Sequence, residues 1–295
     1  MQLPDLEQLC RRIVPGTGSV QVQPLSAGLL SETYKVTRDG TAYALKVAAE
    51  HGPELGMDRV WEVRVLERAG NSKVAPRLLY SDADGTVMLA CWVTGRPWVS
   101  QESNQAENIR SIAELLRRVH ALVIPVPPRV VSPLQWMAVY GAALAHRAVP
   151  PGDPELRTAA VNRAHEIANP PYITGVVCHS DLHALNLIQG AESLILLDWE
   201  YAHVADPLWD LAGWSANNDF AADSQWSLLS DYLQSDPSQQ VWRRLRQFVW
   251  LYDYVCLLWC RLYLNVLGEQ GAGKSVAERA RLLDARLHLP AHYAA

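Results

Sequence analysis

Apolar and polar residues alternate through much of the first ninety positions, after a short amphipathic stretch at the N-terminus. The alternation is clear in residues 19–25 and on either side of Asp39-Gly40, a dipeptide that favours a tight turn between paired strands. Apolar residues recur with helical spacing over residues 57–70, and Gly70 is the expected end of that helix. Two more strands are expected around a turn at residues 82–85. This region therefore predicts a small antiparallel sheet with one inserted helix.

The pattern changes at residue 95, where helical periodicity begins to dominate. Helices are expected within residues 104–123, 134–149 and 150–168, and again in the tryptophan-rich remainder of the chain. Two short apolar runs, 175–181 and 193–202, are expected to form a small hairpin among these helices. The sequence thus predicts an α+β protein with a β-rich N-terminal lobe, residues 1–94, and a larger helical lobe, residues 95–295.

Residues 248–267 have the length of a membrane span, but Asp253 and Arg261 lie within them, so a buried helix of a globular lobe is expected. The net charge is −5 and no run of basic residues occurs, which argues against a nucleic-acid partner. The five cysteines include no C-x-x-C pair, and the N-terminus lacks the apolar core of a secretory signal. A cytoplasmic protein with free thiols is therefore expected, and its oligomeric state stays open.

The most informative polar residues are His179, Asp181 and Asn186, in the pattern H-x-D-x-x-x-x-N, and Asp198, which ends an apolar strand twelve residues later. Phosphoryl transfer needs a carboxylate that accepts the proton of the attacking hydroxyl. It also needs oxygen ligands that hold Mg²⁺ against the phosphates, and an amide and a carboxylate are suitable ligands. These residues match that requirement in type and in order.

Residues 176–212 resemble the Brenner motif and metal-binding segment of the aminoglycoside phosphotransferase and choline kinase superfamily, which has a two-lobe, protein-kinase-like fold. The D-W-E-Y-A sequence at 198–202, followed by Asp210, is most similar to the choline, ethanolamine and bacterial thiamine kinases. The resemblance implies a catalytic base, Asp181, and two Mg²⁺ ligands, Asn186 and Asp198. It also implies that His179 and Asp210 stabilise the catalytic loop.

The β-rich lobe offers matching nucleotide-binding candidates. Lys46 lies on an expected strand, and Glu62 lies on the following helix, as in kinases whose strand lysine pairs with the ATP phosphates and a helix glutamate. By resemblance, residues 25–36 form the turn that covers the nucleotide, and residues 91–92 form the hinge near adenine. The corresponding candidates are Ser26, Gly28, Ser31, Cys91 and Trp92. Cys91 stands where the family often has an acidic residue, so the contacts with adenine stay open.

Aromatic residues and carboxylates cluster after Asp198, and together they suit a cationic or quaternary ammonium substrate. The candidate substrate residues are Glu200, Asp219, Trp250, Asp253 and Tyr254. We therefore expect a kinase that uses ATP and Mg²⁺ to phosphorylate a primary alcohol of a small cationic metabolite. Choline is the first expectation, and thiamine and ethanolamine follow it.

Several alternatives remain. Aminoglycoside and sugar kinases share the core motif, and a nucleotide-binding pseudokinase would keep the fold without the chemistry. His179, Asp181 and His183 alternate and could bind zinc or iron in a hydrolase. Residues 268–275 spell the P-loop G-x-x-x-x-G-K-S, but a working P-loop follows a buried strand, whereas an aromatic helix is expected before it. Ser275 and Glu278 instead suggest a capping box at the start of a helix.

Overall fold

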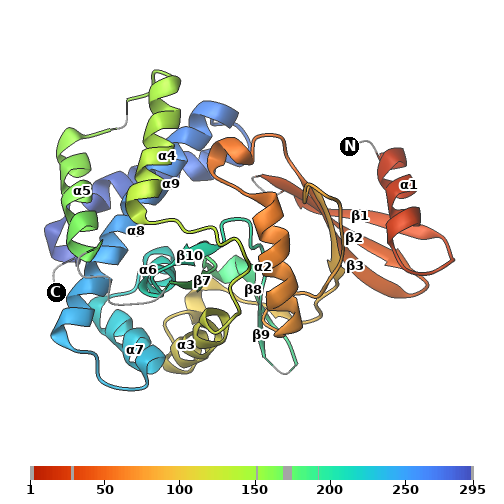
Figure 1. Ribbon diagram of the computed structural model, residues 1–295, viewed down its shortest axis with the longest axis horizontal. Helices are drawn as coiled ribbons and strands as arrows, with labels where there is room; N and C mark the ends of the chain where they lie inside the picture. Colours follow the sequence, from red (N-terminus) through yellow and green to blue (C-terminus); the bar gives the residue numbers. More distant parts are fainter. Residues whose placement is uncertain (1–2, 28–29, 151, 169–174, 192, 294–295) are drawn as a thin grey trace.

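The computed structural model describes residues 3–27, 30–150, 152–168, 175–191 and 193–293. Its N-terminal region is an antiparallel five-stranded sheet in the order β1-β2-β3-β5-β4 (Figure 1). The strands are β1 (Val20–Ala27), β2 (Ser31–Arg38), β3 (Thr41–Ala48), β4 (Leu78–Ser81) and β5 (Val87–Cys91). The turn at Asp39-Gly40 joins β2 to β3 as expected, and both residues have a positive φ.

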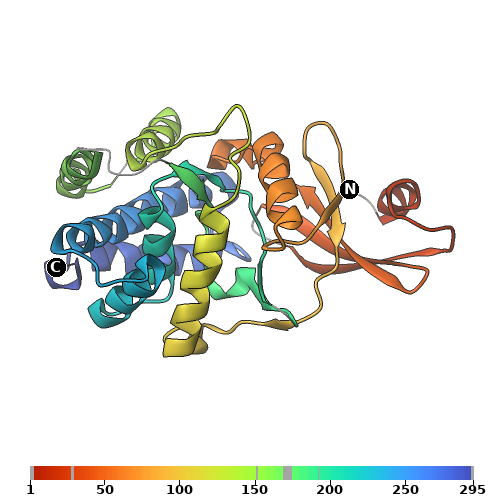
Figure 2. The same ribbon diagram turned by 60° about the horizontal axis from the view of Figure 1, so that its bottom comes forward.

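The two faces of this sheet have different roles. The outer face packs beneath helix α1 (Leu3–Ile13), whose Leu6 and Cys10 join strand residues such as Val36 and Leu45 in a small separate core. Successive strand residues point to opposite faces, so Lys46, next to Leu45, points to the inner face. The inner face therefore turns toward the rest of the molecule, with helix α2 beside it (Figure 2).

Helix α2 (Arg59–Asn71) starts at Asp58, whose carboxylate accepts a hydrogen bond from the Trp61 amide at 3.0 Å. The expected stop at Gly70 is wrong, because the helix continues through this residue. A Cβ at Gly70 would lie 2.9 Å from the Pro76 carbonyl oxygen, so glycine is required here for close backbone packing. The chain reverses two residues after the helix, at Lys73, which has a φ of 58°.

The C-terminal region is mostly helical and surrounds the long, central helix α8 (Figures 1 and 2). Its helices are α3 (Ala106–His120), α4 (Pro133–His146), α5 (Pro154–Ala168), α6 (Leu208–Asn217), α7 (Ala222–Leu233), α8 (Gln239–Leu267) and α9 (Gly273–Leu287). Helix α8 packs against α4, α5, α6 and α9, which explains its dense apolar sequence. Among the described helices, none is long and apolar enough to cross a membrane.

Two small sheets lie among these helices. Strand β7 (Val176–Cys178) pairs with β10 (His203–Ala205), while β8 (Leu187–Gln189) pairs with both β6 (Arg96–Pro97) and β9 (Leu194–Leu196). The expected hairpin between residues 175–181 and 193–202 is therefore wrong, because each run pairs with a different strand. Short 3-10 helices complete the chain: η1 (Pro53–Leu55), η2 (Ser100–Glu102), η3 (Ala184–Asn186) and η4 (Pro290–Tyr293).

The P-loop-like segment joins helix α8 to helix α9, so its context is helix-turn-helix. Helix α9 already begins at Gly273, and the Ser275 hydroxyl donates to the Ala272 carbonyl at 2.7 Å. The expected capping box at Ser275 is therefore wrong, because this residue lies inside the first helical turn. The α+β fold class is confirmed, whereas the division at residues 94 and 95 stays a prediction.

Candidate active site

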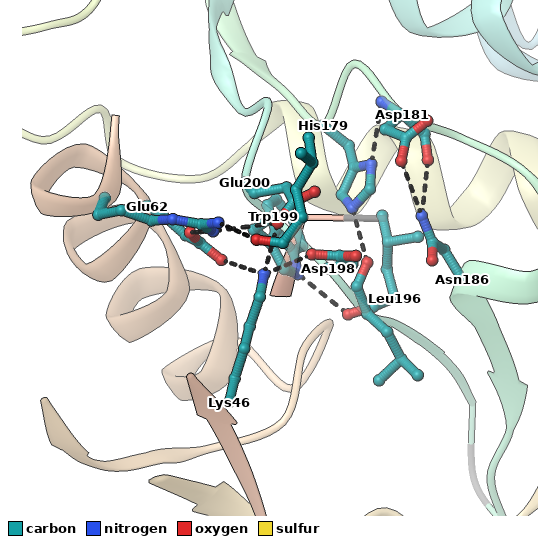
Figure 3. A network of polar contacts seen from close by, with 12 residues as sticks. Lys46, Glu62, His179, Asp181, Asn186, Leu196, Asp198, Trp199 and Glu200 are labelled. Carbon is teal, nitrogen blue, oxygen red and sulfur yellow. Dashed lines mark hydrogen bonds and ion pairs between the residues drawn. The ribbon is translucent and has the colours of Figure 1, made fainter. Parts of the chain in front are cut away.

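Lys46 is the centre of an ion cluster between the N-terminal sheet and the C-terminal region (Figure 3). Its ammonium nitrogen lies 2.9 Å from Glu62 Oε1, 2.6 Å from Asp198 Oδ1 and 3.0 Å from Glu200 Oε2. These partners come from α2 and from the segment after β9, so one side chain contacts both halves of the molecule. The lysine side chain is 17% exposed, and the three carboxylates outweigh its burial and raise its pKa.

Arg59 adds a second cation to this cluster. Its Nη1 lies 2.7 Å from Glu62 Oε2 and 3.0 Å from Glu200 Oε2, and its Nη2 donates to the Leu30 carbonyl at 3.2 Å. Burial and two nearby carboxylates raise the pKa of Glu200 to about 7, although Lys46 and Arg59 oppose this shift. Sequence reasoning missed Arg59, although its position three residues before Glu62 places both side chains on one helix face.

The candidate catalytic loop, residues 179–186, follows β7 and contains His179, Asp181 and Asn186. His179 Nε2 donates to the Leu197 carbonyl at 2.8 Å, and its Nδ1 accepts the Asp181 amide at 3.3 Å. This arrangement requires the neutral ring, and burial lowers the pKa of His179 accordingly. Asn186 Nδ2 donates to the Asp181 carbonyl at 2.9 Å and to its Oδ2 at 3.3 Å, which orients the carboxylate (Figure 3).

Asp210 fixes the backbone of this loop from below. Its carboxylate accepts the His179 and Ser180 amides, each at 2.8 Å, and lies 3.2 Å from His120 Nε2. Burial alone would raise its pKa, but these hydrogen bonds and the neighbouring histidines lower it. Ser180 adopts a left-handed φ of 70°, which is unfavourable for serine and persists because the surroundings hold it.

Asn186 and Asp198 could hold a magnesium ion. Asp198 has a φ of 59° two residues after β9 ends, and Trp199 anchors that turn by donating from Nε1 to the Leu196 carbonyl at 3.0 Å. Asp198 Oδ1 pairs with the Lys46 ammonium, and the side-chain nitrogen of Asn186 donates to the Asp181 carbonyl. The Asp198 Oδ2 and Asn186 Oδ1 atoms are hard oxygen donors, so the residues fit Mg²⁺.

The remaining nucleotide-site candidates lie in different parts of the N-terminal region. Ser31 is buried at the start of β2, and Cys91 ends β5 with its amide donating to the Arg77 carbonyl at 2.9 Å. The ring of Trp92 lies 4.8 Å from the Lys35 ammonium. Ser26 is described only through its backbone in β1, and Gly28 lies outside the described residues.

The candidate substrate residues on α8 do not join this cluster. Asp253 is fully buried and paired with Arg286, and it accepts from the Tyr293 hydroxyl at 2.6 Å. Trp250 and Tyr254 stack on each other in the core, with ring centroids 5.7 Å apart. Asp219 lies 2.5 Å from Arg286 and is mostly exposed.

A different aromatic pair lies next to Glu200 in the sequence and joins α8 to the segment after β9. Tyr201 follows Glu200 directly, and the Trp259 indole donates to its hydroxyl at 2.6 Å, with the two rings edge to face. Burial and the charges of nearby groups, Asp181 among them, raise the pKa of Tyr201. Both rings are half-buried. The periodicity of α8 could not distinguish Trp259 from the core tryptophans, because a contact with Tyr201 links residues 58 positions apart.

The metal-hydrolase arrangement is not supported by these contacts. One ring nitrogen of His179 donates to the Leu197 carbonyl and the other accepts the Asp181 amide, so neither is available to a metal shared with Asp181 and His183. His183 instead lies 3.5 Å from Asp181 Oδ2. Burial opposes its protonation, but the Asp181 carboxylate outweighs burial and raises the pKa of His183.

Comparison with known proteins gives a consistent result. A family model described as the phosphotransferase enzyme family matches residues 21–248. A thiamine kinase from Escherichia coli is 35% identical over 107 residues, which cover 34% of this chain and 38% of that protein. The matched segment therefore spans well under half of the thiamine kinase.

Solved structures match over nearly the whole chain. A choline/ethanolamine kinase family protein from Mesorhizobium loti has a TM-score of 0.78 at 20% identity, covering 99% of this chain and 98% of its own. The choline kinase LicA from Streptococcus pneumoniae, in complex with AMP, has a TM-score of 0.76 at 19% identity, with the same coverage of both chains. These similarities show a choline kinase-type, protein-kinase-like fold and confirm the predicted fold class.

Proposed function

The chain belongs to the phosphotransferase enzyme family, and from this premise we propose that it transfers the terminal phosphoryl group of ATP to a primary alcohol of a small cationic metabolite. The observation that carries the proposal is the convergence of Lys46, Glu62 and Asp198 beside a loop that presents Asp181 and Asn186. That set contains a cation for phosphate, two metal ligands and a base.

Asp181 accepts the proton of the acceptor hydroxyl as its oxygen attacks the γ-phosphorus and the bond to ADP breaks. Its pKa supports this role: burial would raise it, but the contacts with His183 and Asn186 lower it, so the carboxylate is ionised at neutral pH. The neutral ring of His179 and the amide of Asn186 hold the carboxylate in place.

Lys46 binds the phosphate oxygens of ATP, with Glu62 and Arg59 holding it in position. When ATP binds, the Lys46 ammonium must leave the Asp198 carboxylate and pair with a phosphate oxygen instead. The Asp198 carboxylate is then free to bind the metal ion. Asn186 and Asp198 would hold Mg²⁺, which neutralises phosphate charge when bound.

For the acceptor, the aromatic faces of Tyr201 and Trp259 are the proposed cation contacts. The carboxylates of Asp253 and Glu200 are already paired with arginine or lysine, so charge recognition falls mainly to aromatic rings. A quaternary ammonium group donates no hydrogen bond and suits such a site. Choline is therefore the first proposed acceptor, and thiamine, whose kinase shares sequence with this chain, is the second.

ADP release with Mg²⁺-ATP and a panel of choline, thiamine, ethanolamine, amino sugars and aminoglycosides tests the proposal. We expect turnover on a cationic primary alcohol and a loss of at least about 10²-fold in kcat for Asp181→Asn, since general base catalysis contributes at least that much. Asp223→Asn is the matched control, because it makes the same substitution at an exposed position on α7, and it should leave kcat unchanged.

Turnover confined to aminoglycosides would mean that the acceptor is an aminoglycoside and not a small cationic alcohol. Turnover that survives in Asp181→Asn would refute the proposed base. Normal ATP binding without turnover on any alcohol would identify a pseudokinase.

A further inference from the structure

The backbone on both sides of Asp181 is held by side chains from two other helices. The Tyr252 hydroxyl, on α8, donates to the Ser180 carbonyl at 3.2 Å. Asn217 Nδ2, at the end of α6, donates to the Leu182 carbonyl at 2.9 Å. Asp210 binds the amides of this loop, whereas these two residues bind its carbonyls.

Asn217 is the junction of this arrangement. Its amide nitrogen also donates to the Tyr252 hydroxyl at 3.1 Å, and its oxygen accepts from Arg279 Nη2, on α9, at 2.6 Å. Arginine can only donate, so it requires the oxygen of the Asn217 amide to face α9. The nitrogen must then face the catalytic loop. Arg279 therefore fixes the orientation of the Asn217 side-chain amide, with its oxygen toward α9 and its nitrogen toward the loop.

Loss of the Arg279 donor would remove this constraint. A reversed Asn217 amide would place its oxygen against the Leu182 carbonyl and opposite a tyrosine that already donates to Ser180, so two acceptors would meet at the loop. Ser180 is in an unfavourable left-handed conformation that its neighbours must maintain. A loop released on its carbonyl side would shift the Asp181 carboxylate away from the acceptor hydroxyl.

We propose that Arg279, Asn217 and Tyr252 form a positioning triad for the catalytic base, acting through the Ser180 and Leu182 carbonyls. The proposal rests on the proposed kinase function for its readout. It gives helix α9 a role in the reaction, although its N-terminal P-loop-like sequence binds no phosphate in this scheme. None of the three residues touches the reacting atoms, so they are positioning residues.

The test compares Tyr252→Phe and Arg279→Met with the wild type in the acceptor assay. We expect kcat to fall about 10- to 100-fold in each, because small displacements of a catalytic group have effects of that size. The KM for ATP should change less than about twofold, since Lys46, the proposed phosphate contact, lies on the N-terminal sheet and not in this loop. The double variant should lose little more than the worse single variant, because both changes break one chain of hydrogen bonds.

Two controls make the result specific. Tyr263→Phe removes a hydroxyl from the same helix, one with no hydrogen-bond partner in the described part of the chain, and should leave kcat unchanged. Arg279→Lys keeps a donor toward Asn217 and should restore most of kcat. It also serves if the methionine variant fails to fold.

Hydrogen exchange, followed by mass spectrometry on a peptide covering residues 179–186, separates this proposal from the kinase assignment. Faster exchange there in Tyr252→Phe and Arg279→Met, with unchanged exchange in the N-terminal sheet, is expected whether or not the acceptor is known. An active wild type with unchanged kcat in both variants would overturn the triad, and so would unchanged exchange in residues 179–186. A wild type inactive on every acceptor would instead count against the proposed function.

Discussion

Lys46 shows how one residue can carry a site. It reaches Glu62 on its own half of the molecule and Asp198 and Glu200 on the other, so its position depends on the whole fold. Lys274, the lysine of the P-loop-like segment, lies exposed in the first turn of α9. The two lysines offer a direct comparison of fold context against local motif.

We predict that Lys46→Ala weakens ATP binding about 10- to 100-fold, the effect of losing a charge-assisted hydrogen bond worth roughly 1.5–3 kcal/mol. Lys274→Ala should leave the Kd for ATP unchanged. Isothermal titration with Mg²⁺-ATP measures both. Equal weakening in the two variants would restore the P-loop reading.

Asp210 gives a second residue-scale prediction, through pH. Its pKa is lower in the folded protein than the unfolded value of about 3.9, so its ionised form contributes stability above that pH. This contribution is lost as the pH falls through the folded pKa. Asp210→Asn should therefore destabilise the protein by about 2–3 kcal/mol at pH 7, and the difference from wild type should shrink below about pH 4.

Urea unfolding followed by circular dichroism between pH 7 and about pH 2.5 measures this difference, because the range must extend below the unfolded pKa of about 3.9. Asp223→Asn, which is exposed, should show no such trend. A destabilisation by Asp210→Asn that stays constant over the range would mean that its carboxylate charge is not what stabilises the loop.

The sequence indicated the chemistry of single residues better than their partners. Lys46 and Glu62 were paired in advance because kinases place them on a strand and the next helix. The partner of Asp253, Arg286, is 33 residues away on another helix, and no local spacing encodes that contact. The Asp253 carboxylate, which the sequence suggested for a cationic substrate, therefore forms a buried ion pair with Arg286.

At the scale of elements, strand and helix positions were predictable where the apolar period was clean. The exceptions arose from tertiary contacts. Strands β7 and β9 looked like a hairpin because each is apolar and short, but β7 pairs with β10 and β9 with β8. Gly70 looked like a helix end, although its role is close packing against residues 76–77.

Gly70 and Gly141 form a matched pair within helices α2 and α4. At Gly70 an added methyl group would lie 2.9 Å from the Pro76 carbonyl oxygen, whereas at Gly141 it meets no atom within 4 Å. Gly70→Ala should destabilise the protein by about 1–2 kcal/mol, because backbone must move. Gly141→Ala should stabilise it by about 0.5–1 kcal/mol through helix propensity. Thermal unfolding measures the change in stability of each variant. A change of the same sign in both variants would contradict the packing argument.

At the scale of the whole molecule, the candidate site forms where the N-terminal sheet and helix α2 meet the loops of the C-terminal region. The sheet supplies Lys46, α2 supplies Glu62 and Arg59, and the loops after β7 and β9 supply the proposed base and the proposed metal ligands (Figure 3). Buried apolar surface forms one large core in the C-terminal region that extends to α2, and a second, smaller core under α1. The sequence predicted the two lobes, but the separation of the cores follows from the sheet lying between them.

This separation makes Cys10 a natural reporter. The thiol is fully buried in the smaller core, and burial, with Glu7 nearby, raises its pKa to about 11, so it is almost unreactive while α1 stays in place. If α1 lifts from the sheet, the same thiol meets water and regains an ordinary pKa. The alkylation rate of this one cysteine therefore counts the openings of α1, with no label added and without disturbing the inner face where ATP is proposed to bind.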